Sequence, residues 1–562
     1  MKTISISKDK YLLYGFEADG CHIIPPHYQP KKFSGDTILW LLPVYKNGKS
    51  KKIECGSYTV KAKRKEIIIE IQDITAEKEY AAVPCCDFFG NEISFDLPQK
   101  DVFEKTFAEF YWNNQLNQIA ERTFLRKKKD IREGYVLSTL NTKAYAGTYP
   151  AVDHEFHMKG RFAVGGKAEA QLIKRILLLQ IKIMREDKKK AYRNVCAIQP
   201  SRKREYNVWR KSQNSKVKAQ MFRITANIEF VEGVYNYYSL TKDIDFVKAH
   251  IDDIEKNCDY IERYITPDGF LDSHVHYEDQ VIKDFTILQS QLFASNSFKL
   301  MSEIENLLSR KDKAEYYLAL SKRLGEKAVQ TYPLGFWDDD NNRFIDWIDS
   351  KGEKHDRIHL LANELPDLFG FANKNQIDSC RKVIEENSYV FDKFPSFVAA
   401  KIEDYTPSEI GSGGPYDLCA AGRYWCWDAE YLAYRKDGKK LLRQLLQVCD
   451  QAEKDNYLMG ERYDMNYVYY NTDKDAERNW HGASLYYEYP NVWMYIFICK
   501  YLGIRRGFDC EFILEPLFGS GTVKLPQLGI EYTVTDGKVT DVKNTSEQNL
   551  TVKLAGNKIL QL

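Results

Sequence analysis

The chain has 562 residues, enough for several domains or for one large core with smaller domains attached, which argues against a single small binding module. Its 81 Lys and Arg nearly balance 80 Asp and Glu, so the broad basic surface of a nucleic-acid-binding protein is not expected. The sequence begins without a basic and apolar signal segment and holds no run of about 18 apolar residues, so we expect a cytoplasmic protein without membrane contact.

Residues 1–100 are predicted to form a β-sandwich-like domain. The segment "GSYTVKAKRKEIIIEIQDI" alternates or runs β-branched residues, and the glycine-bearing turns "KNGKS" and "FFGNE" flank it. Alternation between such turns is the usual pattern of strands.

Residues 101–507 change to a helical period. Segments such as "KAEAQLIKRILLLQIKIMRED" and "FVKAHIDDIEKNCDYIERYI" repeat apolar residues at i, i+3, i+4 and i+7. About a dozen helices are expected, as six helical hairpins require, near 101–128, 163–185, 217–241, 243–265, 280–308, 311–330, 356–370, 374–388, 394–403, 415–435, 436–455 and 480–503. The most basic run, 201–220, is interpreted as a solvated loop rather than a nucleic-acid patch.

Residues 508–562 return to short alternating strands with a "TDGK" turn, which predicts a small C-terminal β domain. The whole chain is therefore expected to be mainly α, with a helical body between two β domains. The helices show no fixed repeat length, which argues against an ordinary solenoid.

Long polar segments separate the predicted helices. "TYPAVDHEFHMKGRFAVGG" at 148–166 holds Asp153 and Glu155, and "TPDGFLDSHVHYEDQVIKDF" at 266–285 holds Asp272 and Glu278. Two further segments, 335–370 and 403–430, are rich in Trp, Asp and Gly. Loops at one end of a helical scaffold are where binding and catalytic groups concentrate.

Four stretches give the helical body a resemblance to a known family. They are "YNYYSLTKDIDFVKAHIDDIEKNCDYIERYITPDGFL", "LGFWDDDNNRFIDW", "LLANELPDLFGFANKNQ" and "HGASLYYE". Together they resemble the six-hairpin glycosidase superfamily, and most of all its bacterial α-L-rhamnosidase-type glycoside hydrolases. The resemblance implies a six-hairpin (α/α)6 barrel over residues 101–507.

The same resemblance implies a role for individual carboxylates. "HGASLYYE" is similar to a rhamnosidase segment in which the final Glu, here Glu488, is the general base. The segment 148–166 is similar to an acidic rhamnosidase loop, in which Asp153 and Glu155 match the first two acids and Gly165 and Gly166 fall where the third, the family's usual general acid, would stand. Asp153 or Glu155 is then the expected acid.

Chemistry supports the same assignment without the family. Glycoside hydrolysis needs one carboxylic acid for the leaving oxygen and one carboxylate for water, roughly 6.5–9.5 Å apart when the configuration inverts. Aromatic rings commonly cover the apolar faces of sugars. The residues expected to bind substrate are Trp337, Asp338, Trp425, Trp427, Trp480, His481, Tyr487, Asp272 and Glu278.

Cofactors are not expected. Twelve cysteines lack any CxxC pair, and the His pairs at 154/157 and 274/276 match no established metal motif, although the acidic loops would also suit a bound Ca²⁺.

The predicted function is an exo-acting, inverting glycosidase that removes a terminal sugar from an oligosaccharide or glycoside. Three alternatives stay open: a sugar phosphorylase, a polysaccharide lyase on a related helical toroid, or an inactive carbohydrate-binding protein, which the glycines at 165 and 166 would favour. The sequence does not indicate the sugar, the linkage or the oligomeric state.

Overall fold

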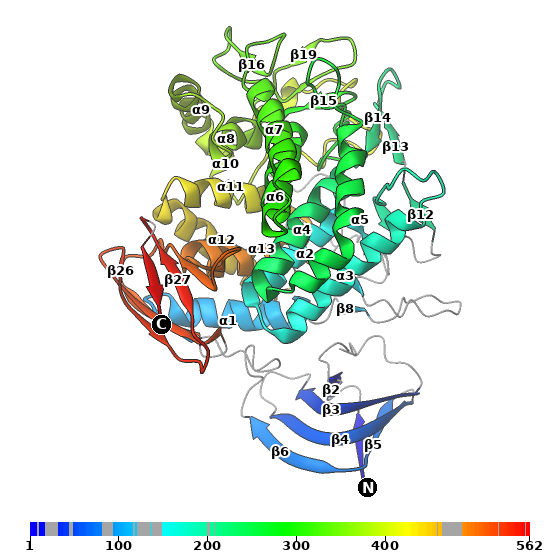
Figure 1. Cartoon of the computed structure of the whole chain (residues 1–562), viewed down its shortest axis with the longest axis vertical. Coiled ribbons are helices and arrows are strands. Elements are labelled where there is room, and N and C mark those ends of the chain that lie inside the picture. Colours follow the sequence, from blue (N-terminus) through cyan, green and yellow to red (C-terminus); the bar gives the residue numbers. More distant parts are fainter. Residues whose placement is uncertain are drawn as a thin grey trace.

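The computed structural model describes most of the chain with several gaps. The described residues are 1–7, 11–16, 32–43, 49–63, 65–80, 94–115, 119–120, 135–136, 149–198, 203–206, 208–457, 459–463, 486–525, 528–556 and 558–562. Figure 1 shows a helical body with strands at both ends of the sequence. Within these residues, no helix combines the length and apolar character needed to cross a membrane.

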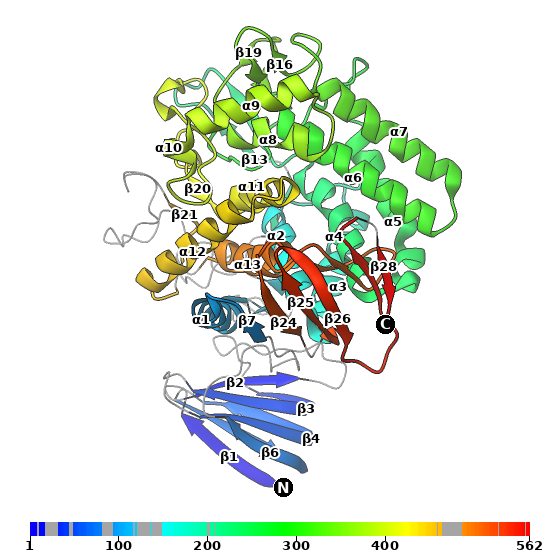
Figure 2. The ribbon, with the colours of Figure 1, turned by 90° about the vertical axis from the view of Figure 1, so that its left-hand side faces the viewer.

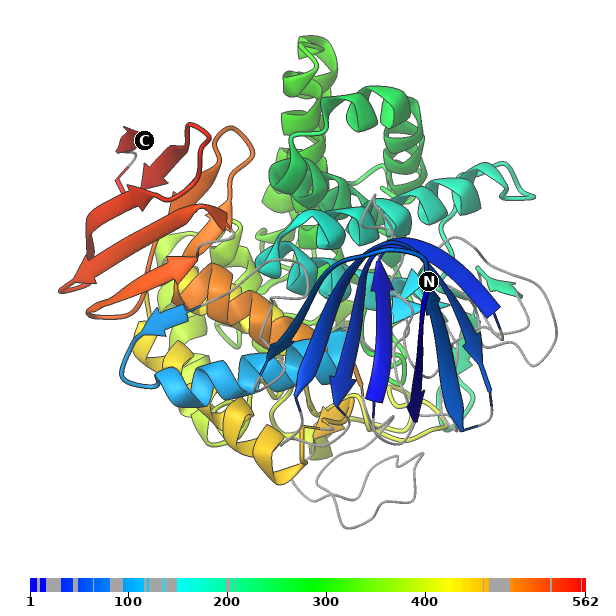
Figure 3. The same cartoon turned by 90° about the horizontal axis from the view of Figure 1, so that it is seen from below.

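The N-terminal strands form one antiparallel sheet of order β1-β5-β4-β3-β2, with β6 beside β4. Alternate residues of β5, Ile67, Ile69 and Ile71, are buried in a core separate from that of the helices. Figure 3 shows this sheet as a twisted fan. The strands are β1 (Lys2–Ser7), β2 (Tyr11–Phe16), β3 (Lys32–Pro43), β4 (Ser50–Ala62), β5 (Glu66–Ile71) and β6 (Ile74–Tyr80).

The helical body consists of inner helices that contact each other in a closed ring, each paired with an outer helix. The ring order is α13, α2, α4, α6, α8, α11 and back to α13. The inner helices are α2 (Ala151–Val164), α4 (Thr225–Thr241), α6 (Leu288–Leu307), α8 (Leu360–Leu368), α11 (Gly422–Tyr434) and α13 (Glu488–Tyr495), which continues as a π-helix (Ile496–Tyr501). The outer helices are α1 (Lys100–Phe110), continued by a π-helix (Tyr111–Gln115), α3 (Lys167–Arg185), α5 (Ile244–Glu262), α7 (Lys311–Ala328), α9 (Lys374–Glu386) and α12 (Gly438–Lys454), and a short α10 (Ser388–Phe391) follows α9.

Every inner helix starts at the same end of the ring, where the preceding segments join edge to edge. The joining pairs are Tyr149 with Ile198, Met221 with Val275, Ile287 with Trp347, His359 with Ala399, and Ala421 with Arg462. We call this end the long-loop face. Its described segments are 149–150, 186–198, 203–206, 208–224, 263–287, 329–359, 392–421, 455–457, 459–463 and 486–487.

Small hairpins and bridging strands stiffen the long-loop face. They are β10 (Tyr149–Pro150), β11 (Ala197–Ile198), β12 (Arg204–Glu205), β13 (Val208–Lys211), β14 (Lys218–Met221), β15 (Thr286–Ile287), β16 (Trp337–Asp338), β17 (Arg343–Phe344), β18 (Trp347–Ile348), β19 (Lys354–His355), β20 (Ala420–Ala421) and β21 (Arg462–Tyr463). A separate pair, β8 (Ile119–Ala120) and β9 (Tyr135–Val136), precedes them in the chain.

The opposite end of the ring has short connections and contacts the C-terminal strands. Lys242, between α4 and α5, donates from Nζ to the carbonyl oxygen of Phe508 at 3.1 Å, and Tyr235 stacks on the Phe508 ring at 4.5 Å. Figure 2 shows these strands beside α13. We call this end the short-loop face.

The C-terminal strands form two sheets of order β22-β23-β27-β28 and β26-β25-β24-β7. Because β7 precedes α1, the C-terminal domain draws one strand from the segment before the ring. The bounds are β7 (Ser94–Asp96), β22 (Ile504–Arg506), β23 (Phe512–Leu514), β24 (Gly521–Leu525), β25 (Ile530–Thr535), β26 (Lys538–Asn544), β27 (Thr551–Leu554) and β28 (Ile559–Gln561).

Several segments differ from the prediction. Residues 217–224 and 280–287 were expected to begin helices but precede α4 and α6, and two other segments differ along most of their length. Residues 151–164 were expected as a loop and are helix α2, whose polar residues from 154 onward are buried, so no amphipathic period marks them. Residues 394–403 were expected as a helix, but only Ile402–Asp404 form a 3₁₀ turn. The segment before this turn is a buried loop, which explains its apolar run. It is held by isolated β-bridges, such as the one between Phe397 and Ala420.

Candidate functional site

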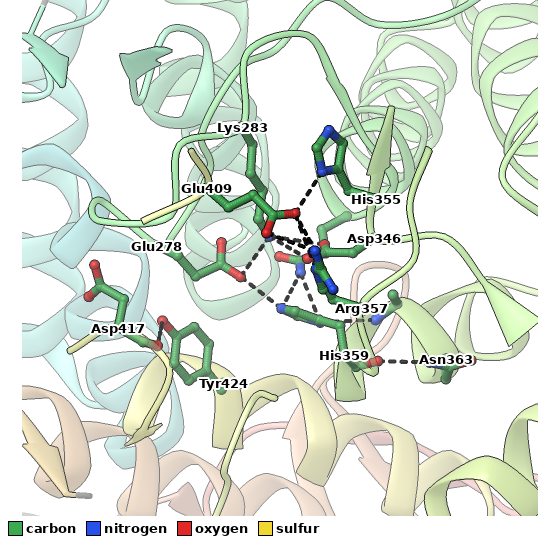
Figure 4. Close-up of polar contacts among 12 residues, drawn as sticks. Glu278, Lys283, Asp346, His355, Arg357, His359, Asn363, Glu409, Asp417 and Tyr424 are labelled. Carbon is green, nitrogen blue, oxygen red and sulfur yellow. Dashed lines mark hydrogen bonds and ion pairs between the residues drawn. The ribbon is translucent and has the colours of Figure 1, made fainter. Parts of the chain in front are cut away.

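Glu278 lies at the centre of a buried polar cluster on the long-loop face, in the segment before α6 (Figure 4). Its Oε1 lies 3.2 Å from the Lys283 ammonium and 2.7 Å from Nε2 of His359, the residue that caps α8. Lys283 also donates to Asp346 at 2.9 Å. Burial alone would raise the pKa of Glu278, but Lys283 and then His359 lower it below its usual value. Glu278 is thus held as a carboxylate, and its Oε2 is buried with no hydrogen-bond partner among the described residues.

Asp417 and Asp279 form a second, differently built acidic pair. Their carboxyl groups hydrogen-bond to each other, and Asp417 also accepts from the backbone N–H of Gln280 at 2.7 Å. Burial raises the pKa of Asp417 well above its usual range, against the pull of Arg462, and Asp279 adds to the rise. Asp417 is fully buried, whereas the Asp279 side chain is 21% exposed. Burial would also raise the pKa of Asp279, but the hydrogen bond with Asp417 and the charges of Arg462 and Arg210 lower it. Asp417 is therefore the member of the pair that favours the proton.

A chain of alternating charges joins this acidic pair to Glu488. Arg462 donates from Nε to Asp417 at 3.0 Å, and its Nη2 lies 2.7 Å from Glu461. Glu461 also accepts from Nη2 of Arg423 at 3.3 Å, and the same nitrogen donates to Oε2 of Glu488 at 2.8 Å. Every charged group in the chain from Asp417 to Glu488 is buried.

Glu488 is the first residue of α13 and is fully buried. Oε1 accepts from the backbone N–H and Nε of Arg423, the second residue of α11. Burial raises the pKa of Glu488, and the Arg423 guanidinium opposes that rise. Glu488 thus lies in the first turn of the last inner helix, as the sequence suggested. Its arginine partner was not indicated by the sequence.

Glu155, the predicted acid on α2, sits between a lysine and a tyrosine. Lys159 lies 2.8 Å from its Oε1, and the Tyr277 hydroxyl donates to Oε2 at 2.9 Å. Lys159 is itself buried, so Glu155 forms an ion pair inside the helical body. Asp153 lies on the first turns of the same helix, at the long-loop face, and its side chain is outside the described residues.

His276 is buried between the Glu155 and Glu278 clusters. Burial lowers its pKa to about 4, although both carboxylates favour its charged form. His276, Tyr277, Glu155 and Trp427 line an internal cavity of about 10 Å³, roughly the space of one water molecule.

Of the predicted sugar-binding aromatic residues, two pack in the core, and Trp427 lies near Glu155. Trp425 is fully buried and donates to Gln444 of α12, and Tyr487 is buried against the His157 ring at 4.1 Å. These contacts indicate packing roles for both. Trp427 instead donates to the Tyr277 hydroxyl at 3.1 Å and lies under the Lys159 ammonium, 3.9 Å from the ring centre.

The remaining predicted binding residues within the described part of the chain contact partners other than Glu278. Trp337 and Asp338 belong to the β16–β17 hairpin, where Asp338 is buried and accepts from Asn341 and Lys354. Asp272 pairs with Arg223 at 2.8 Å. Trp480 and His481 lie outside the described residues.

Gly165 and Gly166 connect α2 to α3 at the short-loop face. Both have positive φ, 69° and 95°, which favours glycine at these positions. A Cβ on Gly165 would lie 3.1 Å from Leu528 of the C-terminal domain. These glycines therefore lie at the opposite end of the ring from the proposed site, and a carboxylate at either position would not reach the long-loop face.

Several residues of the site were not predicted from the sequence: Lys283, His359, Asp417, Arg423, Glu461 and Arg462. Asp417 is the last residue of the glycine-rich run "GSGGPYD", which is the local signal that marked its neighbourhood. Arginine and lysine partners have no local signal, because they come from different loops.

Within the described residues, no group of three or more His, Cys, Asp and Glu side chains is placed to hold a metal ion. The cysteines in this part of the chain are buried and form no disulfide bond with one another.

Comparison with known proteins gives a result in structure only. No protein-family model and no curated protein matches the sequence. The chain is similar in structure to a GH78 family rhamnosidase of Bacillus sp. GL1, with a TM-score of 0.54 and 13% identity over 99% of this chain and 52% of that one. It is also similar to a protein named sialidase, with a TM-score of 0.56 and 11% identity over 98% of this chain and 57% of that one.

The chain spans about half the length of these two proteins, and at such identities the likeness concerns the fold. The motifs predicted a resemblance to rhamnosidase-type glycoside hydrolases, and the similarity in structure to a GH78 family rhamnosidase confirms that resemblance at the level of the fold.

Proposed function

We propose that the protein is a glycoside hydrolase that acts at the long-loop face, and that the ring with its outer helices is an (α/α)6 barrel. One observation carries the proposal: neighbouring loops of this face hold carboxyl groups in opposite states. Lys283 and His359 lower the pKa of Glu278 against burial, whereas burial and then Asp279 raise the pKa of Asp417. Acid–base hydrolysis of a glycosidic bond needs a carboxyl group with a raised pKa as its acid, and the environment of Asp417 suits that role.

In this proposal the Asp279–Asp417 pair is the general acid. Asp417 holds the proton, and Asp279, the more exposed member, passes it to the leaving oxygen as the Asp417 proton moves across their shared hydrogen bond to Asp279. The sequence favoured Asp153 or Glu155 for this role. Glu155 is less suitable because its two oxygens already contact Lys159 at 2.8 Å and the Tyr277 hydroxyl at 2.9 Å.

Glu488 keeps the role of general base that the family resemblance implies. Arg423 stabilises its ionised form, and the first turn of a helix also favours a negative charge. Glu278 accepts a hydrogen bond from a sugar hydroxyl through its unpartnered Oε2.

Inversion of configuration fits this pair. Arg462, Glu461 and Arg423 stand between Asp417 and Glu488 in the chain of contacts, an arrangement that favours the wider spacing of an inverting pair over the roughly 5–5.5 Å of a retaining pair. Similarity in fold to a GH78 family rhamnosidase makes a terminal rhamnose the first sugar to test.

The test is a screen of nitrophenyl glycosides, starting with the α-L-rhamnoside, with the first product anomer identified by NMR. Glu488→Gln and Asp279→Asn should each reduce kcat at least about a hundredfold, as expected for loss of general acid or base catalysis. Glu305→Gln, a buried carboxyl at the other end of α6, is the matched control and should keep wild-type kcat.

Other outcomes would overturn the proposal. Turnover that requires phosphate would indicate a phosphorylase, and an absorbance rise from an unsaturated product would indicate a lyase. Sugar binding without turnover by the wild type would indicate a binding protein. Retention of configuration would remove the inverting mechanism.

A further inference from the structure

A β-hairpin docks onto the loops that carry the proposed acid pair. It consists of β13 and β14, paired antiparallel with Trp209 opposite Gln220 and Lys211 opposite Lys218. The N–H of Gln213 at its tip donates to the Ile410 carbonyl at 2.8 Å, and Ser212 bridges to Gly411. In Figure 1 the hairpin stands beside the other elements of the long-loop face. The run that the sequence suggested as a solvated loop is therefore an ordered part of this face.

The two faces of the hairpin differ in character. Successive side chains of a strand point to opposite sides, so Val208, Arg210, Ala219 and Met221 share one face and Trp209, Lys211 and Lys218 share the other. The first face packs into a small core with Val275 and Ile282. The second face is exposed: 43% of Trp209 is accessible, and both lysines are exposed.

The exposed face of the hairpin carries positively charged side chains that no described carboxylate pairs with. Residues 208–221 contain Arg210, Lys211, Lys216 and Lys218 and no acidic residue. Arg210 turns inward to Asp279 at 3.4 Å. Within the described part of the chain, no carboxylate forms an ion pair with the other three cations. The Lys218 ammonium lies 4.7 Å from the centre of the Trp209 ring, so aromatic surface and charge occur together.

The position of this face relates it to the proposed reaction. Trp209 is the neighbour of Arg210, which contacts Asp279 of the proposed acid pair. The centre of the Trp209 ring also lies 5.8 Å from that of the His274 ring, and His274 belongs to the loop that leads to Glu278 and Asp279. A sugar chain whose terminal unit is cleaved at Asp279 therefore meets the hairpin within a few sugar units.

We propose that Trp209, Lys211 and Lys218 form a subsite for acidic sugar units, such as uronic acids, on the part of the substrate beyond the cleaved bond. Trp209 covers one face of a sugar ring, and the two ammonium groups bind its carboxylate. This inference rests on the proposed function, because it takes the chain leaving the acid pair to be an oligosaccharide.

The test measures binding by calorimetry, with trigalacturonic acid and its fully methyl-esterified form as probes. The ester keeps the rings and removes the charge. The wild type should bind the acid roughly tenfold more tightly than the ester, a difference that falls as salt rises. Lys211→Gln with Lys218→Gln should abolish the preference, while Trp209→Ala should weaken binding of both probes.

Two controls match these variants elsewhere on the surface. Lys248→Gln with Lys322→Gln removes two exposed lysines of the outer helices, and Tyr389→Ala removes a 66% exposed aromatic ring. Both should bind as the wild type does. Equal affinity for acid and ester, no effect of Trp209→Ala, or no binding at millimolar concentration would each overturn the subsite.

The binding measurement does not require turnover. Preferential binding of the acid with no hydrolysis of any glycoside would leave the subsite in place and remove the proposed hydrolase. Hydrolysis of aryl glycosides without any preference for the acid would do the reverse.

Discussion

Arg423 and Glu488 form a bidentate ion pair that links the first turns of two neighbouring inner helices, α11 and α13. Nη2 lies 2.8 Å from Oε2 and Nε lies 3.1 Å from Oε1, and both side chains are buried. The planar guanidinium fixes the plane of the carboxylate, so this arginine decides the orientation of the proposed base.

Arg423→Met should destabilise the protein by roughly 3–5 kcal/mol, because it leaves Glu488 buried without its counter-charge. The measurement is the free energy of unfolding in urea at neutral pH. Adding Glu488→Gln to Arg423→Met should recover part of the loss, since the double variant buries no unpaired charge there. A double variant less stable than Arg423→Met alone would contradict the pairing.

Gly422 tests the position of Glu488 without changing any charge. A Cβ on Gly422 would lie 2.9 Å from Cγ of Glu488 and 3.1 Å from the backbone nitrogen of Tyr489. Gly422→Ala should therefore displace the first turn of α13, destabilise the protein by roughly 1–3 kcal/mol and lower kcat.

Gly160→Ala is the matched control for that variant. Its Cβ would lie 2.6 Å from Oδ1 of Asn491, again where an inner helix packs on α13, but three residues after Glu488 and on the side of α2. It should cost similar stability and leave kcat closer to the wild-type value. An equal fall of kcat in both variants would argue against a special role for the Glu488 position.

Lys283→Met should make substrate binding sensitive to acid. Lys283 is the main group that lowers the pKa of Glu278 against burial, so its removal raises that pKa. The variant should show KM rising as pH falls through a range where the wild-type KM is constant, measured between pH 4 and 8. Lys354→Met, which removes a lysine bound to Asp338 instead, should keep the wild-type profile.

His276 should make the protein less stable in acid. Burial lowers its pKa to about 4 in the folded protein, below the value of roughly 6.5 in an unfolded chain. Between these values the unfolded state binds more protons, so stability falls as the pH is lowered, by roughly 3 kcal/mol in total from this residue. Urea unfolding at pH 7 and pH 4.5 should show a smaller pH dependence for His276→Gln than for the wild type. An unchanged dependence would contradict the neutral, buried histidine.

Prediction from the sequence succeeded where a segment has one buried side. Outer helices such as α3, α5 and α7 have one apolar face on the core and one solvent-exposed face, which produces the 3.6-residue period. The N-terminal strand β5 alternates for the same reason. Helix α2 lacks such a pattern because it is buried on all sides and carries His154, Glu155 and Lys159 inside, so its charges suggested a loop.

The sequence by itself determined the succession of strands, helices and strands, the family resemblance, and Glu488 as a carboxylate beginning the last inner helix. Only the tertiary structure decided which partners surround each carboxyl group: Arg423 for Glu488, Lys283 and His359 for Glu278, and Asp279 for Asp417. The physical reason is that the pKa of a buried carboxyl depends on charges within a few ångströms. Those charges come from loops distant in sequence, which closure of the ring brings to one face.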